Sequence, residues 1–219
     1  MPRTGRRPGR PDTRGEIVAA AARRFAQAGY DATSMRQIAA DAGVDPALVR
    51  RFFGGKEELF SEVASAAIDP SSYVTTVTTG PLDQAGERLI RHYLALLGTV
   101  DQPGPLLGVI RSAVTSEHAA HVLRRFLAER ILGRVAEALH TGQGELRAAL
   151  AASQLVGVAV ARYAVKLAPL TAADDDCIAG WIAPVLQHYL TGEVQSARRE
   201  PAEAVRRADG GQSADLAPH

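Results

Sequence analysis

The chain has 219 residues, of which 46% are hydrophobic and 22% charged, and its formal net charge is +1. This balance is that of a soluble globular protein with a sizeable core in one large or two small domains. No stretch approaches the roughly 20 uncharged apolar residues that span a bilayer. The basic N-terminus lacks the apolar core of a secretory signal. One cysteine, Cys177, excludes an internal disulfide framework, and we expect it to be a buried structural thiol in a cytoplasmic protein without membrane contact.

Residues 1–12 form a basic arm rich in proline and glycine. Five arginines occur in residues 1–14 against a single acid, Asp12. Basic charge in a flexible chain end is a common way to bind phosphate, although a solubilising tail has the same composition.

Four short helices are predicted next, over residues 13–28, from 34 to 41, from 46 onwards, and from about 55 to 68. Asp12 is the expected N-cap of the first helix, and Gly29 ends that helix at its C′ position. Ser34 and Gln37 have the spacing of a capping box, which begins the second helix. Asp45 caps the third helix, and Pro46 stands at its first position, where a missing N–H costs nothing.

The second and third helices have the features of a helix-turn-helix. Ala39 is the small residue that two steeply crossing helices need, and Gly43 tolerates the positive φ of a tight turn. Ile38, Val44 and Val49 are spaced to pack against the first helix. The third helix is then free to place its N-terminal half in a DNA major groove. A generic helical hairpin is the alternative interpretation.

The rest of the chain is also predicted to be helical, so the fold class is all-α. We expect a helix-turn-helix domain of three helices over residues 13–60, followed by a fourth helix that continues to residue 68. A larger C-terminal ligand-binding and dimerisation domain is expected over residues 82–191. The threonine-rich segment Ser71 to Pro81 is read as a linker. Further helices are expected over residues 82–100, 105–116, 117–140, 144–167 and 174–190. Residues 192–219 are polar, lack periodicity and are predicted to be disordered.

The motifs flanking the turn closely resemble the signature of the TetR family of transcriptional regulators, over roughly residues 13–64. The matching segments are Gly29-Tyr30-Asp31-Ala32-Thr33-Ser34, Ile38-Ala39, Ala42-Gly43-Val44, Phe53 and Lys56-Glu57-Glu58-Leu59-Phe60. The resemblance implies a homodimer that binds a double-stranded DNA operator as a repressor and leaves it when a small-molecule effector enters the C-terminal domain. We expect no cofactor, no metal and no enzymatic activity.

The resemblance and the basic arm together predict the DNA-binding residues. Thr33 and Lys56 match phosphate-binding positions of the family, and an arginine-rich arm can reach an adjacent minor groove. Two positions depart from the family pattern: Leu48 replaces a common small hydroxyl residue, and Arg50 replaces a common tyrosine. Arg50 could contact guanine with two hydrogen bonds or hold a phosphate. The full predicted set is Arg6, Arg7, Arg10, Thr33, Arg36, Pro46, Ala47, Leu48, Arg50 and Lys56.

Two further sites are predicted in the C-terminal domain. A small residue recurs every four positions between residues 149 and 161, which lets another helix approach closely, in a dimer or within one chain. The predicted dimer residues are Ala149, Ser153, Gly157, Ala161, Trp181, Val185 and Tyr189. Polar residues within apolar segments are the candidate effector contacts: His92, Tyr93, Arg111, Gln154 and Tyr163. Arg111 could recognise an anion or lie at the surface in an ion pair.

His118 and His121 share a helix face, but two histidines without further ligands are a weak metal signal.

Two alternatives to a ligand-responsive regulator remain open at this point. One is a small helical enzyme, although the chain lacks a phosphate-binding loop and a nucleophile elbow. The other is a DNA-binding regulator that responds to a protein partner or has no ligand switch.

Overall fold

The computed structural model describes residues 12–102, 104–140 and 142–193, and within them every regular element is helical, which confirms the all-α class. Twelve α-helices, one 3₁₀ turn and two π-helical turns occur in the described residues. In chain order they are α1 (Thr13–Ala28), α2 (Met35–Asp41), α3 (Pro46–Phe53), α4 (Lys56–Ile68), α5 (Pro70–Thr78), η1 (Leu82–Gln84), α6 (Ala85–Leu97), α7 (Pro105–Thr115), α8 (Glu117–Leu127), η2 (Ala128–Leu132), α9 (Gly133–Leu139), α10 (Gly144–Ala159), η3 (Val160–Ala164), α11 (Ala168–Ala172) and α12 (Asp175–Thr191).

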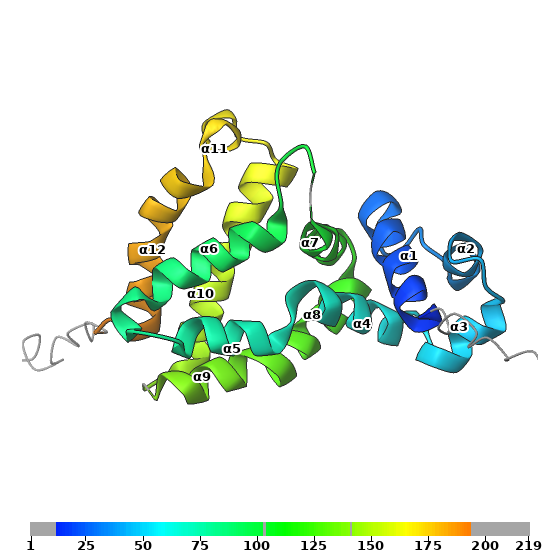
Figure 1. Cartoon of the computed structure of the whole chain (residues 1–219), viewed down its shortest axis with the longest axis horizontal. Coiled ribbons are helices and arrows are strands. Elements are labelled where there is room, and N and C mark those ends of the chain that lie inside the picture. Colours follow the sequence, from blue (N-terminus) through cyan, green and yellow to red (C-terminus); the bar gives the residue numbers. More distant parts are fainter. Residues whose placement is uncertain (1–11, 103, 141, 194–219) are drawn as a thin grey trace, which may run out of the picture.

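The helices form a small group at one end and a larger bundle at the other (Figure 1). The small group contains α1, α2 and α3, and α4 leads from it into the bundle. In the bundle, α6 packs against α12 and α5, while α10 packs against α9 and α12. Contact between the two groups is made mainly by α1 against α7 and by α4 against α7 and α8.

The predicted start signals of the first helices are confirmed. The Asp12 carboxylate accepts from the backbone N–H of Gly15 at 3.0 Å. Ser34 and Gln37 form the complete capping box, and the Asp45 carboxylate accepts from the N–H of Ala47 at 2.7 Å. Gly43 has φ +65°, which is the left-handed turn that the sequence predicts between α2 and α3.

The prediction of a linker over Ser71–Pro81 is wrong, because residues 70–78 form α5. The pair Asp69-Pro70 ends α4 and also begins α5, since the Asp69 carboxylate accepts from the Ser71 N–H and Pro70 occupies the first turn. Tyr73 and Val77, four residues apart, are buried against the bundle. This burial outweighs the weak helix propensity of the threonines.

Three expected helices differ from the prediction in their details. The helix expected over 117–140 contains the π-helical turn η2, and the helix expected over 144–167 ends in η3 before the missed short helix α11. The first bundle helix, expected to reach residue 100, ends at Leu97, since Gly98 has φ +70°. The expectation for Cys177 is also wrong: its thiol is exposed near the start of α12.

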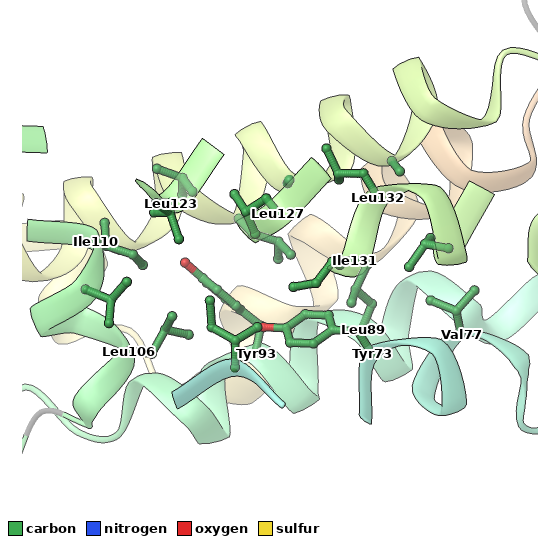
Figure 2. A pocket seen from close by; sticks show the side chains of 17 residues that line it. Tyr73, Val77, Leu89, Tyr93, Leu106, Ile110, Leu123, Leu127, Ile131 and Leu132 are labelled. Carbon is green, nitrogen blue, oxygen red and sulfur yellow. The ribbon is translucent and has the colours of Figure 1, made fainter. Parts of the chain in front are cut away.

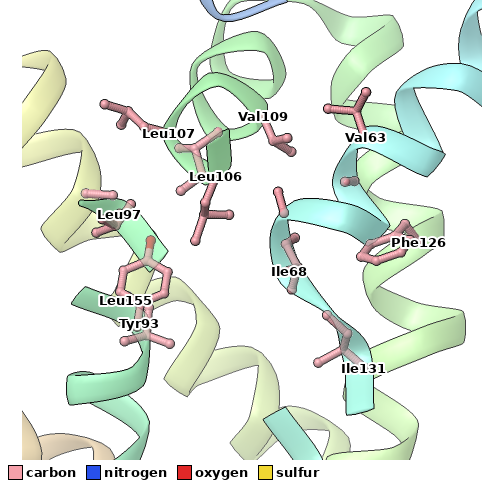
Figure 3. Close-up of a cluster of buried hydrophobic side chains, with 14 of the residues drawn as sticks. Val63, Ile68, Tyr93, Leu97, Leu106, Leu107, Val109, Phe126, Ile131 and Leu155 are labelled. Carbon is pink, nitrogen blue, oxygen red and sulfur yellow. The ribbon is translucent and has the colours of Figure 1, made fainter. Parts of the chain in front are cut away.

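One apolar core runs through both groups of helices. Figure 3 shows Val63 and Ile68 of α4 lying between α7, with Leu106 and Val109, and α8, with Phe126. The two ends of the molecule therefore share packed side chains through α4.

Candidate nucleic-acid interface and internal cavity

The crossing of α2 and α3 depends on a few buried side chains. Ala39, at 0% exposure, lies where the two helices meet, and its carbonyl accepts from the N–H of Val44 at 3.0 Å. On α2, Asp41 forms an ion pair with Arg24 of α1, in which the Arg24 Nη2 also donates to the Asp41 Oδ1 at 2.9 Å. This pair raises the pKa of Arg24 and lowers that of Asp41, chiefly through its hydrogen bond. Local turn geometry and this ion pair therefore fix α2 on α1.

The third helix buries one face and exposes the other. Val49 and Phe53 are buried, and the guanidinium of Arg14 lies 5.1 Å from the centre of the Phe53 ring. Pro46, Ala47 and Arg50, three of the predicted groove-facing residues, are exposed, whereas Leu48 is half-buried. The exposed face of α3 thus carries small side chains at the N-terminus of the helix and cationic side chains in its last turn.

Arg36 of α2 is exposed, as are Arg50 and Arg51 of α3. None of the ion pairs found in the described part of the chain involves these three guanidinium groups. Unneutralised cations on two adjacent short helices are the charge arrangement that phosphate or a base edge requires. The predicted arm residues Arg6, Arg7 and Arg10 lie outside the described residues.

Thr33 is placed differently from the prediction. Its side chain is 3% exposed, and its hydroxyl donates to the carbonyl of Gly29 at 2.7 Å. The hydroxyl that was expected to bind a phosphate therefore holds the turn before α2.

Lys56 lies at the first position of α4, beside the same turn. Its Nζ is 4.2 Å from the centre of the Tyr30 ring and 3.5 Å from the carbonyl oxygen of Asp31. Burial lowers the pKa of Lys56, and the Asp31 charge partly opposes this shift. Lys56 is half-buried and lies at the N-terminus of α4, where an anion is favoured.

The bundle contains an apolar cavity of about 90 Å³ that is partly open to its surroundings. Seventeen residues line it, of which fifteen are aliphatic and two are tyrosines, Tyr73 and Tyr93. They come from α4, α5, α6, α7, α8, η2, α9 and α10. In Figure 2 the Tyr93 ring reaches into the space between Leu106, Ile110 and Leu123. This volume is smaller than that of an apolar cavity of about 150 Å³ that binds benzene in another protein, so a ligand of that size or larger would have to move the lining side chains apart.

Of the five predicted effector residues, Tyr93 alone lines this cavity. The imidazole of His92 is 3.0 Å from the Ser72 hydroxyl and packs on the Tyr73 ring from outside. Arg111 and Tyr163 line a separate surface groove together with Lys166. Gln154 is half-buried on α10 and lines neither space.

Sequence reasoning missed the contacts that join the two ends of the molecule. Ser116, the N-cap of α8, donates its hydroxyl to the Asp31 carboxylate at 3.0 Å, 85 positions away in the chain. Ser112 of α7 donates to the carbonyl of Phe25 at 3.3 Å. Gly108 lies so close to α1 that a Cβ there would be 2.7 Å from the Cβ of Ala26. A glycine inside the apolar run of residues 106–110 was the one available signal of this close approach.

Apolar side chains are exposed along α10, in the segment that follows η3, and along α12. Trp181 is 79% exposed and Leu146 is 56% exposed, and the other large members are Leu150, Val156, Val165, Leu167 and Val185. Of the predicted dimer residues, Ser153 and Gly157 are exposed, while Ala149, Ala161 and Tyr189 are half-buried. A patch of this kind is typical of a protein–protein contact.

The segment Gly144–Ala164 is long and apolar enough to cross a bilayer by length and composition, with mean hydropathy 1.2 and 28% of that window buried. It carries Glu145, Arg147 and Arg162, and all three arginine nitrogens of Arg147 bind backbone carbonyls. One such helix is weak evidence for membrane insertion, and its apolar face belongs to the exposed patch described above.

His118 and His121 are both exposed on α8. Within the described residues, no group of three or more histidine, cysteine or acidic side chains is arranged to hold a metal ion.

Two family models match the chain. Residues 17–63 match the model described as bacterial regulatory proteins, tetR family, and residues 83–190 match the tetracyclin repressor-like C-terminal domain. No curated protein matches the chain.

Several solved structures are similar. A TetR-family regulator from Streptomyces coelicolor A3 is 38% identical, with a TM-score of 0.61, over 85% of this chain and 99% of that one. A TetR-family transcriptional regulator from Mesorhizobium loti is 23% identical, with a TM-score of 0.57, over 81% and 95%. AibR, solved with isovaleryl coenzyme A and operator DNA, is 19% identical, with a TM-score of 0.54, over 80% and 98%.

The helix-turn-helix with its exposed arginines, the larger helical bundle and both family matches agree with one another and with the resemblance found in the sequence. The chain therefore belongs to the TetR family, and it is a DNA-binding transcriptional regulator.

Proposed function

We propose that the protein is a homodimeric repressor that binds a palindromic operator and leaves it when a small molecule occupies the apolar cavity. The observation that carries this proposal is the position of α4. Lys56, at its first residue, directly follows the helix-turn-helix, and Ile68, at its last, lines the cavity about 18 Å away along the helix axis. A ligand that moves Ile68 would therefore move the end of the helix that carries Lys56.

In this proposal residues 13–60 form the DNA-binding domain, with α4 continuing to residue 68, and residues 82–191 form the effector and dimer domain. α5 lies between these ranges and packs on the bundle, so we assign it to the second domain. The cytoplasm is the expected compartment, because operator DNA is there.

We assign the dimer contact to the exposed apolar face of α10 and α12, around Trp181. Two copies of this helix pair would form a four-helix interface with two-fold symmetry. Such a dimer places its two α3 helices on half-sites roughly 34–36 Å apart. A ligand-induced change in this spacing needs a coupling free energy of only about 1–3 kcal/mol to vacate an operator.

We propose that the cavity binds its occupant without transforming it. Fifteen of its seventeen lining side chains are aliphatic, and the remaining two are tyrosines, so the lining contains no nucleophile paired with a base. A turnover assay with any ligand that binds would overturn this part of the proposal if product formed.

Selection of operator sequences from random DNA tests the DNA-binding part. The selected site should be palindromic. The substitution Arg50→Ala should then weaken binding by about 5- to 100-fold if Arg50 reads a base, with relaxed preference at one position of each half-site. Arg125→Ala is the matched control, because Arg125 is an exposed arginine of α8, away from α3. Equal losses in both variants would contradict a specific role for Arg50.

Repression itself is tested with the selected operator placed upstream of a reporter gene. Expression should be low with the intact regulator and high with Arg50→Ala. Higher expression with the intact regulator would instead identify an activator.

A further inference from the structure

The lining of the cavity limits the chemistry of what it can hold. Its seventeen lining residues include no charged, amide or imidazole side chain. An ionised group that entered would lose its hydration and gain no counter-charge, which is strongly unfavourable. The cavity therefore selects against carboxylates, phosphates and ammonium groups.

One polar group in the cavity wall has no partner. Tyr93 is 4% exposed, and its hydroxyl makes no hydrogen bond within the described structure. Most buried polar side-chain atoms are paired, so an orphaned hydroxyl that reaches into a cavity marks a position where a ligand atom can bind. Burial raises the pKa of Tyr93 well above its ordinary value, so the hydroxyl keeps its proton and can donate it.

Another tyrosine of the bundle, Tyr163, differs from Tyr93 in having a hydrogen-bond partner. The hydroxyl of Tyr163 donates to the carbonyl oxygen of Gly98 at 2.6 Å, so it is satisfied within the protein. Tyr163 lines the separate surface groove, not the cavity.

The two cationic side chains of the neighbouring groove are also outside the cavity. Arg111 and Lys166 line the surface groove, which shares only Ile110 with the cavity lining. An anionic head group inside the cavity would therefore have neither of these cations as a lining partner.

We propose that the effector is a small, uncharged aliphatic molecule with one oxygen that accepts a hydrogen bond from the Tyr93 hydroxyl. This inference rests on the proposed function, because it assumes that the cavity is the effector site. Aliphatic contacts supply the affinity, and the single hydrogen bond supplies the orientation.

The test uses the full chain without DNA and compares probes with six carbon atoms. We expect 2-hexanone and 1-hexanol to raise the melting temperature and to bind in titration calorimetry at pH 7.5. Hexanoate and hexylammonium, which are ionised at this pH, should not bind. Tighter binding of hexanoate than of 2-hexanone, or no binding of any probe, would overturn the proposal.

The substitution Tyr93→Phe removes the hydroxyl and keeps the ring. It should lower the affinity for 2-hexanone by about 2- to 10-fold, as expected for one lost hydrogen bond. The affinity for 1-hexene, which has no oxygen, should be unchanged or improved. Tyr163→Phe is the matched control and should leave 2-hexanone binding unchanged. Equal weakening of 2-hexanone and 1-hexene by Tyr93→Phe would refute the hydrogen bond.

Location is tested with Ala152→Phe, which places an aromatic ring at a lining position of α10 and should abolish binding of 2-hexanone. Undiminished binding by this variant would place the probe elsewhere and overturn the assignment.

A separate measurement of operator binding distinguishes this inference from the proposed function. Binding of 2-hexanone without operator release would contradict the ligand switch and leave the cavity chemistry supported. Operator release by hexanoate would support the switch and overturn the chemistry inferred here.

Discussion

Gly108 offers the sharpest test of how the two ends of the molecule are joined. A Cβ at this position would lie 2.7 Å from the Cβ of Ala26 and 3.0 Å from its Cα, whereas real Cβ contacts are rarely closer than 3.4 Å. In Gly108→Ala, α7 and α1 must therefore move apart by about 0.7 Å. Overpacking of this kind costs roughly 1–3 kcal/mol, and alanine returns about 1 kcal/mol of helix propensity. We expect a net loss of about 0–2 kcal/mol in the free energy of unfolding.

The larger expected effect is on DNA binding, because α1 is the helix on which α2 is held. In the proposed dimer, a displaced α1 would move both α3 helices relative to their half-sites. We expect operator affinity, measured by fluorescence anisotropy on the selected operator, to fall at least fivefold, or about 1 kcal/mol.

Gly133→Ala is the matched control, since the nearest atom to a Cβ there is the carbonyl oxygen of Ala128 at an ordinary 3.9 Å. It should leave operator affinity unchanged and raise the free energy of unfolding by up to about 1 kcal/mol. If Gly108→Ala bound the operator as tightly as Gly133→Ala, the close approach of α7 to α1 would not control the DNA-binding end.

Three further predictions concern the dimer face, the contact between the two ends, and pH. Trp181→Glu places a charge on the exposed apolar face, so light scattering after size exclusion should show a monomer; an unchanged dimer mass would move the interface elsewhere. Ser116→Ala removes both the N-cap of α8 and the bond to Asp31, and urea unfolding should show a loss of about 1–2 kcal/mol, whereas a loss near zero would mean that neither contact contributes. Burial lowers the pKa of His92 below 6.5, so the native state binds this proton less readily than the unfolded chain, and stability should fall as the pH drops below about 6.5. The variant His92→Gln should show a flatter dependence of melting temperature on pH, and an unchanged slope would exclude His92 as its source.

The helix-turn-helix was predictable because its signals are local. The capping box at Ser34, the turn at Gly43 and the cap at Asp45 act within a few residues of the backbone that they shape, so the order of residues is sufficient to locate them. The exposure of Arg50 follows in the same way, since Val49 and Phe53 determine which face of α3 is buried.

Helix α5 was missed for the opposite reason. Threonine-rich segments are poor helices when isolated, and this one is stabilised by the burial of Tyr73 and Val77 against elements distant in the chain. The same limit applies to Thr33, whose hydroxyl bonds inward to Gly29 in the folded chain.

Sequence alone was enough for the family, the helical class and the DNA-reading turn, because periodicity and capping are short-range properties. The cavity, the unpaired hydroxyl of Tyr93 and the contact of Ser116 with Asp31 required the tertiary structure. Each of these features joins residues from several helices, and an aliphatic side chain that lines a cavity has the same sequence pattern as one that fills a core. Whether a buried hydroxyl finds a partner depends on its neighbours in space, which the spacing of residues along the chain does not specify.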